Sequence, residues 1–163
     1  MKSPLIILLL FLSVVVGQQQ YNVTSVEVGQ QEYNIKNLLK HDGVFVKKFS
    51  DDPINGKVFQ IFDDIKVPLG MIENGKKKGK WIRWYQNGRK KDESTYKDGE
   101  LNGLVTSWYK NGQKKGEGFY KDGEPDGLIT SWYKNGRKKN EYIFQNGKLI
   151  SNIKKNKDGS VKE

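Results

Sequence analysis

The stretch GLVTSWYKNGQKKGEGFYKDGEPD, from Gly103 to Asp126, has a near copy on either side of it. The preceding copy, residues 79–102, begins GKWIRWYQNGRKKDESTYKDGE, and the following copy, residues 127–150, reads GLITSWYKNGRKKNEYIFQNGKLI. Three tandem copies of 24 residues are typical of an array of small structural units that pack on their neighbours. Because such arrays usually bind other molecules, the repeat predicts a binding protein.

Two turn signals divide each copy into a pair of strands. Asn-Gly stands at 87–88, 111–112 and 135–136, and Asp-Gly stands at 98–99 and 122–123, with Asn-Gly in its place at 146–147. These dipeptides tolerate the positive φ of tight hairpin turns, and β-branched and aromatic residues flank them. The sequence therefore predicts an all-β fold: an elongated, single-sheet antiparallel meander of tandem 24-residue β-hairpins.

A two-residue turn at Asn-Gly would fix the register of each hairpin. It sets a glycine across from an aromatic ring in all three copies, an arrangement in which the ring covers the bare strand position. Two consecutive lysines follow the Asn-Gly turn after each tryptophan, with one intervening residue. The same register sets each tryptophan across from the second of these lysines, as in Trp108 and Lys115. The expected glycine and aromatic pairs are Gly79 with Tyr96, Gly103 with Tyr120 and Gly127 with Phe144, and the expected tryptophan pairs are Trp84 with Lys91, Trp108 with Lys115 and Trp132 with Lys139.

The array extends beyond its clear copies. Residues 56–78 form a degenerate first unit, which precedes units 79–102, 103–126 and 127–150 in an array that covers residues 56–150. Residues 18–55 are interpreted as an N-terminal capping segment, in which YNVTSVEV alternates like a strand and YNIKNLLK fits a short helix or a strand. Residues 151–163 keep one Asp-Gly without a tryptophan, and we expect a half-repeat or a flexible tail there.

The N-terminus has the order of a secretory signal peptide. Lys2 is followed by an apolar run from Leu5 to Val16 and then by the small residue Gly17. The run is too short to span a bilayer comfortably, although an uncleaved anchor is the alternative interpretation. We therefore expect residues 1–17 to be removed and the protein to be exported, to the periplasm or the exterior.

The repeated WYxNGxKKxExxYKDGxxxG resembles the variant MORN repeat of bacterial YwqK-type antitoxins, and HDGVFVKKFSDDPINGKV resembles the segment that leads into such arrays. The resemblance covers residues 41–150. It implies an elongated antiparallel sheet, and it implies a protein that neutralises a partner toxin by direct contact. Two features depart from it: Ile61 stands where the first repeat should have tryptophan, and a signal peptide is unusual for an antitoxin of a cytoplasmic toxin.

The aromatic residues offer both structural and binding roles. The column Trp84, Trp108 and Trp132 could stack bases or sugars, but in a sheet without a large aliphatic core we expect the rings to cover one another. The residue after each tryptophan is a tyrosine, and this second column is expected to carry contacts with a partner, because interface energy concentrates in tyrosine, tryptophan and arginine. Its members are Tyr85, Tyr109 and Tyr133.

A basic triplet of residues follows the Asn-Gly turn after each tryptophan, and together the triplets predict a ladder of positive charge. The triplets are Arg89-Lys90-Lys91, Gln113-Lys114-Lys115 and Arg137-Lys138-Lys139. The ladder could attract an acidic protein or anionic lipid, or it could merely keep hairpins soluble. Glutamates two positions after the last lysine are expected to share its face and partly neutralise it, which argues against nucleic-acid binding. The basic candidates for partner contact are Arg89, Lys90, Lys114, Arg137 and Lys138.

Catalysis has little support in the composition. The chain has one histidine, His41, and no cysteine, which removes thiol chemistry, histidine-rich metal sites and most catalytic triads. Asp51, Asp52, Asp63 and Asp64 could bind calcium but are also expected at turns. We therefore expect a monomeric, non-catalytic protein-binding module without metal or cofactor, antitoxin-like or immunity-like. The alternative is an envelope-associated adaptor for anionic lipid or cell-wall polysaccharide, because similar aromatic repeats occur in cell-wall-binding modules.

Overall fold

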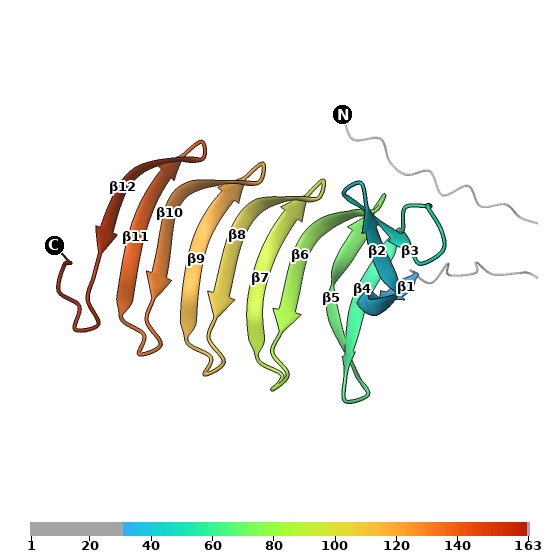
Figure 1. The fold of residues 1–163 in the computed structure, drawn as a ribbon, viewed down its shortest axis with the longest axis horizontal. Coiled ribbons are helices and arrows are strands. Elements are labelled where there is room, and N and C mark those ends of the chain that lie inside the picture. Colours follow the sequence, from blue (N-terminus) through green and yellow to red (C-terminus); the bar gives the residue numbers. More distant parts are fainter. Residues whose placement is uncertain (1–30, 163) are drawn as a thin grey trace, which may run out of the picture. The chain divides into compact units, whose positions relative to one another are not determined.

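The computed structural model describes residues 31–162, and these residues form a long open sheet of ten strands (Figure 1). From β4 onward the strands lie side by side in sequence order, each antiparallel to the next. The predicted all-β meander is confirmed. Its strands are β4 (Gly56–Phe62), β5 (Ile65–Glu73), β6 (Lys76–Trp84), β7 (Lys90–Lys97), β8 (Glu100–Trp108), β9 (Lys114–Lys121), β10 (Glu124–Trp132), β11 (Lys138–Gln145) and β12 (Lys148–Lys154).

The beginning of the described chain departs from a pure antiparallel meander. Strand β1 (Glu32–Asn34) pairs with β4 in parallel, so the large sheet is mixed. After the 3-10 helix η1 (Ile35–Asn37), strands β2 (Leu38–His41) and β3 (Val44–Lys47) form a separate hairpin. The stretch YNIKNLLK thus contains both a short helical turn and strand residues. Among the described residues no helix is long and apolar enough to cross a membrane.

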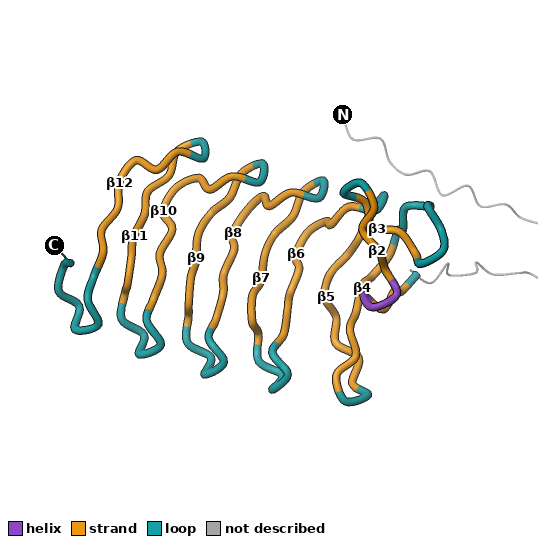
Figure 2. The backbone as a smooth tube through the Cα atoms, viewed as in Figure 1, coloured by secondary structure: helices purple, strands orange, loops and turns teal. Residues whose placement is uncertain are grey.

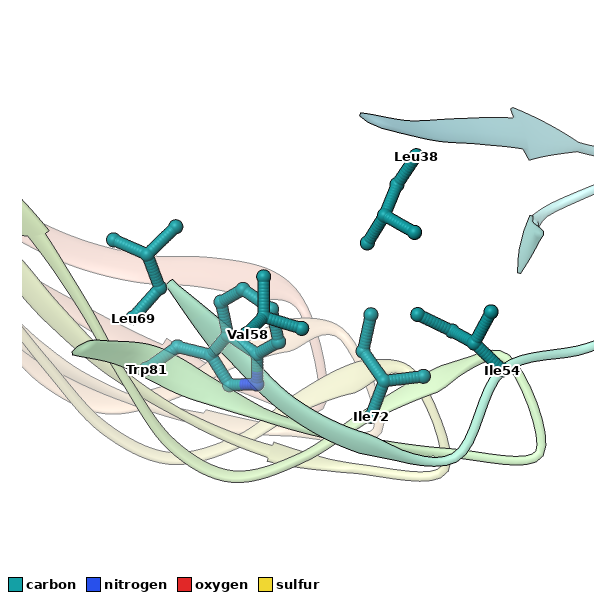
Figure 3. Close-up of a cluster of buried hydrophobic side chains, with 6 residues drawn as sticks. All are labelled: Leu38, Ile54, Val58, Leu69, Ile72 and Trp81. Carbon is teal, nitrogen blue, oxygen red and sulfur yellow. The ribbon is translucent and has the colours of Figure 1, made fainter. Parts of the chain in front are cut away.

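The hydrophobic core lies at this end of the sheet. Leu38 from β2 packs with side chains of β4, β5 and β6, and the Trp81 ring lies among them (Figure 3). Trp81 is only 5% exposed, and its indole N–H donates to the Met71 carbonyl at 3.0 Å. The buried members of this cluster are Leu38, Ile54, Val58, Leu69, Ile72 and Trp81. The sequence patterns did not single out Trp81, because the other copies carry Val105 and Ile129 at its position.

The Asp-Gly turns have the expected two-residue form. Asp98 and Gly99 have φ values of 52° and 90°, and Asp122 and Gly123 have 49° and 84°. Each pair joins neighbouring strands directly, since Lys97 pairs with Glu100 and Lys121 pairs with Glu124. Such mirror-image turns match the twist of the strands that they connect.

The Asn-Gly turns at 87–88, 111–112 and 135–136 are longer than predicted, and the tryptophan pairs are therefore wrong. In the central copy the Gly112 N–H donates to the Tyr109 carbonyl at 2.9 Å, and the Tyr109 N–H donates to the Gln113 carbonyl at 2.8 Å. This three-residue loop, with glycine alone at positive φ, sets Trp108 across from Lys114 instead of Lys115. Lys90 and Lys138 likewise replace Lys91 and Lys139 across from Trp84 and Trp132.

A β-bulge then restores the register expected for the rest of each hairpin. The shift between Ser107 and Trp108 admits Lys115 as an extra residue, so Thr106 pairs with Glu117, as a two-residue turn would also require. Farther along, each repeat glycine meets its aromatic partner. The pairs Gly79 with Tyr96, Gly103 with Tyr120 and Gly127 with Phe144 are all present.

The repeat glycines also meet a backbone requirement that pairing alone did not reveal. Gly103 has a φ of 129° and Gly127 has a φ of 94°, values that residues with a Cβ atom rarely adopt. The ladder to the preceding strand is interrupted beside Gly103 and beside Gly127, between Tyr96 and Ser94 and between Pro125 and Ile129. The glycines therefore permit the irregular backbone that ends one stretch of pairing and begins the next.

The residues after the last clear copy continue the array. Strand β12 pairs with β11, and the turn that follows repeats the Asn-Gly hydrogen bonds: the Asn156 N–H donates to the Ser160 carbonyl and the Gly159 N–H donates to the Asn156 carbonyl. Figure 2 shows the turns after β6, β8, β10 and β12 following one another along the lower end of the strands, with the Asp-Gly turns at the other end. The predicted signal peptide and the stretch Tyr21 to Val28 lie outside the described residues.

Candidate interaction surface

The three candidate tyrosines tie each hairpin to the next one. The hydroxyl of Tyr85 donates to the Trp108 carbonyl at 2.7 Å, and that of Tyr109 donates to the Trp132 carbonyl at the same distance. Tyr133 continues the series to the Lys155 carbonyl at 2.8 Å. All three side chains are half-buried. Their hydroxyls therefore satisfy backbone carbonyls of the following unit, and only their rings offer surface to a partner.

Asparagine and arginine side chains reinforce the same connection. The Asn87 and Asn111 amides donate to the carbonyls of Lys110 and Lys134, at 3.3 and 3.1 Å. The Arg89 guanidinium donates to Lys110 at 3.4 Å, whereas that of Arg137 donates to the Asp158 carbonyl at 2.8 Å. Both candidate arginines are thus attached to the next turn while they stay exposed at the end of the sheet.

The middle lysine of each triplet pairs with the repeated glutamate. The ammonium groups of Lys90, Lys114 and Lys138 lie 2.7, 2.6 and 2.6 Å from the carboxylates of Glu93, Glu117 and Glu141. The prediction that the last lysine would share the face of the glutamate is wrong, because the bulge changes the phase of the strand. Lys91 and Lys139 instead lie over the rings of Tyr85 and Tyr133, at 5.9 and 5.7 Å from the centroids.

Two of the glutamates bind a second lysine. Hydrogen bonds from Lys80 and then from Lys90 lower the pKa of Glu93 below its ordinary value. The hydrogen bond from Lys138, with further help from Lys155, lowers the pKa of Glu141. These carboxylates therefore stay charged in mildly acidic solution, and the lysine ladder is partly neutralised by acids of the array itself.

The tryptophans contact lysines of the preceding hairpin. The Lys90 ammonium lies 5.9 Å from the centroid of the Trp108 ring, and the Lys114 ammonium lies 5.6 Å from that of Trp132. A cation over an indole at an exposed site contributes about 0.5–1 kcal/mol. Trp84 differs in that its indole N–H donates to the Pro68 carbonyl at 3.0 Å. The tryptophan column thus joins units as well as strands.

A row of exposed apolar side chains crosses four strands of the array. Leu104 pairs with Phe119 and Leu128 pairs with Ile143, and Phe119 and Leu128 lie next to the paired residues Gly118 and Ile129. The four side chains are 50%, 49%, 52% and 47% exposed, in chain order. By strand alternation they share a face with the Thr106, Glu117 and tryptophan positions. We call this side of β8–β11 the tryptophan face and these four residues the apolar row.

The apolar row was visible in the sequence but was not recognised as a candidate surface. Leu104 and Phe119 lie across from each other also in the register that a two-residue turn would give, yet an apolar residue in a strand is normally assigned to the core. Here the array has no layer covering this face within residues 79–162, so the row remains exposed. In the unit before it the corresponding positions are polar, Lys80 and Thr95, which ends the row at β8.

Comparison with known proteins finds no matching protein-family model, no matching curated protein and no matching solved structure.

Proposed function

We propose that the array is a non-catalytic module that binds a partner protein through the tryptophan face. The observation that supports this proposal best is the apolar row, because contiguous exposed apolar residues mark interaction sites more often than scattered ones do. Trp108 and Trp132 and paired charges flank it on the same face, and an apolar centre with a polar rim is the usual anatomy of a protein interface. Neutralisation of a toxin by an exported, monomeric MORN-like protein is the form of this function that the repeat resemblance suggests.

The hydrogen-bond ladder between units supports binding by a rigid surface. From residue 79 onward each unit is attached to the next through its tyrosine hydroxyl, together with an asparagine amide, an arginine guanidinium or both. The apolar row therefore has fixed spacing before a partner arrives. A preorganised surface loses less conformational entropy on binding than a flexible one. The lysines Lys90, Lys114 and Lys138 then contribute around the row, with Arg89 and Arg137 at the end of the sheet. The rings of Tyr85, Tyr109 and Tyr133 follow the tryptophans directly in the chain, so strand alternation places them on the opposite side, where they hold the units together.

The test compares a row variant with a matched control. Protein carrying Phe119→Ser and Ile143→Ser and protein carrying Ile65→Ser, an exposed isoleucine outside the row, are used as bait in extracts of the native host. A partner identified with the unmodified chain is then purified, and its Kd for each variant is measured. We expect the row variant to lose at least about tenfold in affinity and the control to lose none. Equal affinity of all three proteins would contradict the proposal.

A second candidate is binding to anionic membranes, which the row and the net charge of +10 also favour. Apolar side chains inserted at a lipid surface and lysines near anionic headgroups act together in such binding. Sedimentation with phosphatidylglycerol vesicles separates the two candidates. Vesicle binding that falls with salt and with the row variant, in a protein that captures no partner, would favour the membrane. A polysaccharide ligand would instead require the exposed rings and would be insensitive to salt.

A further inference from the structure

The two ends of the strands differ in charge within the array. The three loops that follow the repeated tryptophans contain ten lysines and arginines and no acid, whereas the three turns at the opposite end contain three lysines and four acids. The loops are residues 85–91, 109–115 and 133–139, at the lower end in Figure 2, and the turns are residues 96–101, 120–125 and 144–149. Lysines that only kept hairpins soluble would be expected at both ends. We call the three loops the cationic edge.

Most charges of the cationic edge have no acidic partner in the part of the chain that the structure describes. Lys90, Lys114 and Lys138 pair with the repeated glutamates. The other seven cations are exposed and form no ion pair with a described carboxylate. These seven are Arg89, Lys91, Lys110, Lys115, Lys134, Arg137 and Lys139. Because like charges held close together repel one another, an anion at this edge would relieve the repulsion.

The repeat sets the spacing of the cationic edge. Two strand spacings of about 4.8 Å separate neighbouring units, so that equivalent cations recur at roughly 9–10 Å. The Asn87 amide and the Arg89 guanidinium donate to the Lys110 carbonyl, and the Asn111 amide donates to the Lys134 carbonyl. The loops are therefore attached to one another before a ligand arrives. A linear ligand that runs across the strands would contact the cations of successive loops.

The groups left free at this edge are mostly hydrogen-bond donors. The carbonyls of Lys110 and Lys134 already accept from neighbouring side chains, and the Gly112 N–H donates within its own loop. Ammonium and guanidinium groups donate hydrogen bonds and do not accept them. A ligand whose polar groups only accept, such as a chain of phosphates, leaves none of its own groups unpaired there. A peptide, by contrast, would bring N–H groups that need acceptors.

The cationic edge also offers little for bases to stack on. The rings of Tyr85 and Tyr133 lie beneath Lys91 and Lys139, and their hydroxyls are bonded to backbone carbonyls. Stacking of bases on aromatic rings supplies much of the affinity of proteins that bind single-stranded nucleic acids. A phosphate polymer without bases therefore fits this edge better than a nucleic acid does.

We propose that the cationic edge binds a linear polymer of phosphate groups without bases, of the polyphosphate type, which runs across the strands and contacts successive loops. The phosphate oxygens accept hydrogen bonds from the ammonium groups and from the guanidinium groups of Arg89 and Arg137. A chain that reaches from one loop to the next gains affinity because its later contacts form within the same complex. The site is separate from the tryptophan face and does not depend on that face binding a protein.

The first test measures binding of long-chain inorganic polyphosphate to the full chain. Tripolyphosphate, at the same concentration of phosphate groups, is too short to contact all three loops, and we expect it to bind at least about tenfold more weakly. The affinity for the long polymer should fall at least about a hundredfold between about 50 and about 200 mM salt, because the polymer releases its counterions on binding. Equal affinity for the two phosphates would overturn the proposal.

The second test compares two triple variants that remove the same charge from opposite ends of the strands. The edge variant is Lys91→Gln with Lys115→Gln and Lys139→Gln, and the control is Lys97→Gln with Lys121→Gln and Lys148→Gln. We expect the edge variant to lose at least about tenfold in affinity for long-chain polyphosphate and the control to lose less than about threefold. Equal losses, in proteins with native circular dichroism spectra, would show attraction by net charge without a defined site and would overturn the proposal.

Two further measurements separate this site from the other candidates. Oligothymidylate with the same number of phosphates should bind no more tightly than the polyphosphate, and tighter binding that the edge variant abolishes would assign the edge to nucleic acid and overturn the proposal. The row variant Phe119→Ser with Ile143→Ser should bind polyphosphate normally. Its loss of a partner protein or of vesicle binding would then bear on the tryptophan face alone.

Discussion

The two ends of the sheet are stabilised in different ways. Among the described residues, the buried hydrophobic side chains all lie between Leu38 and Trp81, where a β2–β3 hairpin packs against β4–β6. From β7 onward the buried side chains are Ser94, Thr106 and Thr130, and several of the large apolar side chains are half exposed. The first region is a small conventional core, and the second is a single layer of strands whose sides remain open.

The open region depends on hydrogen bonds that recur in each unit. At one end of the strands the tyrosine hydroxyls reach the next unit, and at the other end turn glycines bond to the unit before, as the Gly123 N–H does to the Leu101 carbonyl at 2.9 Å. Burial of apolar area gives several kcal/mol at one site, whereas each of these bonds contributes about 0.5–1.5 kcal/mol. The comparison therefore predicts large single-site effects in the core and small, repeated ones in the array.

The largest effect should come from Trp81→Ala. Truncation of this buried ring leaves a cavity beside Val58 and Ile72, and we expect a loss of about 3–5 kcal/mol in the free energy of unfolding. Trp132→Ala, at a half-buried array position, should cost about 1–2 kcal/mol. Because the array can open in parts, hydrogen exchange resolved by segment is the suitable measurement, in addition to chemical denaturation. Equal costs at the two tryptophans would mean that the array has a core of its own.

The array follows from a repeated local pattern and the core from contacts between unlike segments, which explains how much of each the sequence could predict. The repeat fixed the strands of the array and the glycine pairs, because every unit reports the same pattern three times. The predicted pairing of Trp108 with Lys115 is wrong because the Asn-Gly dipeptide fits two kinds of turn. A two-residue turn and the observed three-residue loop both place Gly112 at positive φ, so the sequence does not distinguish them. The parallel strand β1 and the burial of Trp81 depend on contacts between unlike segments, and no local pattern encodes those.

The candidate surface shows the same division. The columns of tyrosine, arginine and lysine could be listed from the repeat, but their use in joining units depends on which atoms of neighbouring hairpins meet. Tyr109 lies one unit before the carbonyl that it bonds, a relation that appears only when the units are stacked. The apolar row could be seen in the sequence, whereas its exposure follows from the absence of a second layer over β8–β11 in the described residues.

A smaller effect is expected from Tyr109→Phe, which removes one bond of the inter-unit ladder. The Trp132 carbonyl loses its hydroxyl donor while the ring remains, so the cost should be about 1 kcal/mol. Hydrogen exchange should rise in β8–β11 and stay unchanged in β4 and β5, because a nearest-neighbour array passes the loss mainly to adjacent units. Tyr120→Phe is the matched control: its hydroxyl has no hydrogen bond to the described residues. Faster exchange throughout the sheet would show that core and array unfold as one unit.

The smallest effect is a dependence on pH that separates the array from the core. Glu93 accepts from Lys80 and Lys90, both at 2.7 Å, and these hydrogen bonds lower its pKa in the folded protein. The ionised form is therefore favoured by folding: its contribution is present above the ordinary glutamate pKa of about 4.3 and is lost as the pH falls through the lower folded-state pKa. The pairs are partly exposed, so the contribution should be about 0.3–1 kcal/mol.

Acidification from pH 6 to pH 3 should then weaken the β6–β7 hairpin more than the cluster around Ile72, which contains no carboxylate. Glu93→Gln cannot ionise, so this variant should be less stable than the unmodified chain at pH 6 and should lose less on acidification. The difference in unfolding free energy between the two proteins should shrink toward low pH, where the native glutamate is protonated as well. Glu100→Gln, at the exposed first position of β8, controls for the change in net charge. If both variants show the same pH dependence, the lysine pairs of Glu93 contribute nothing specific, and the array resists acid as well as the core does.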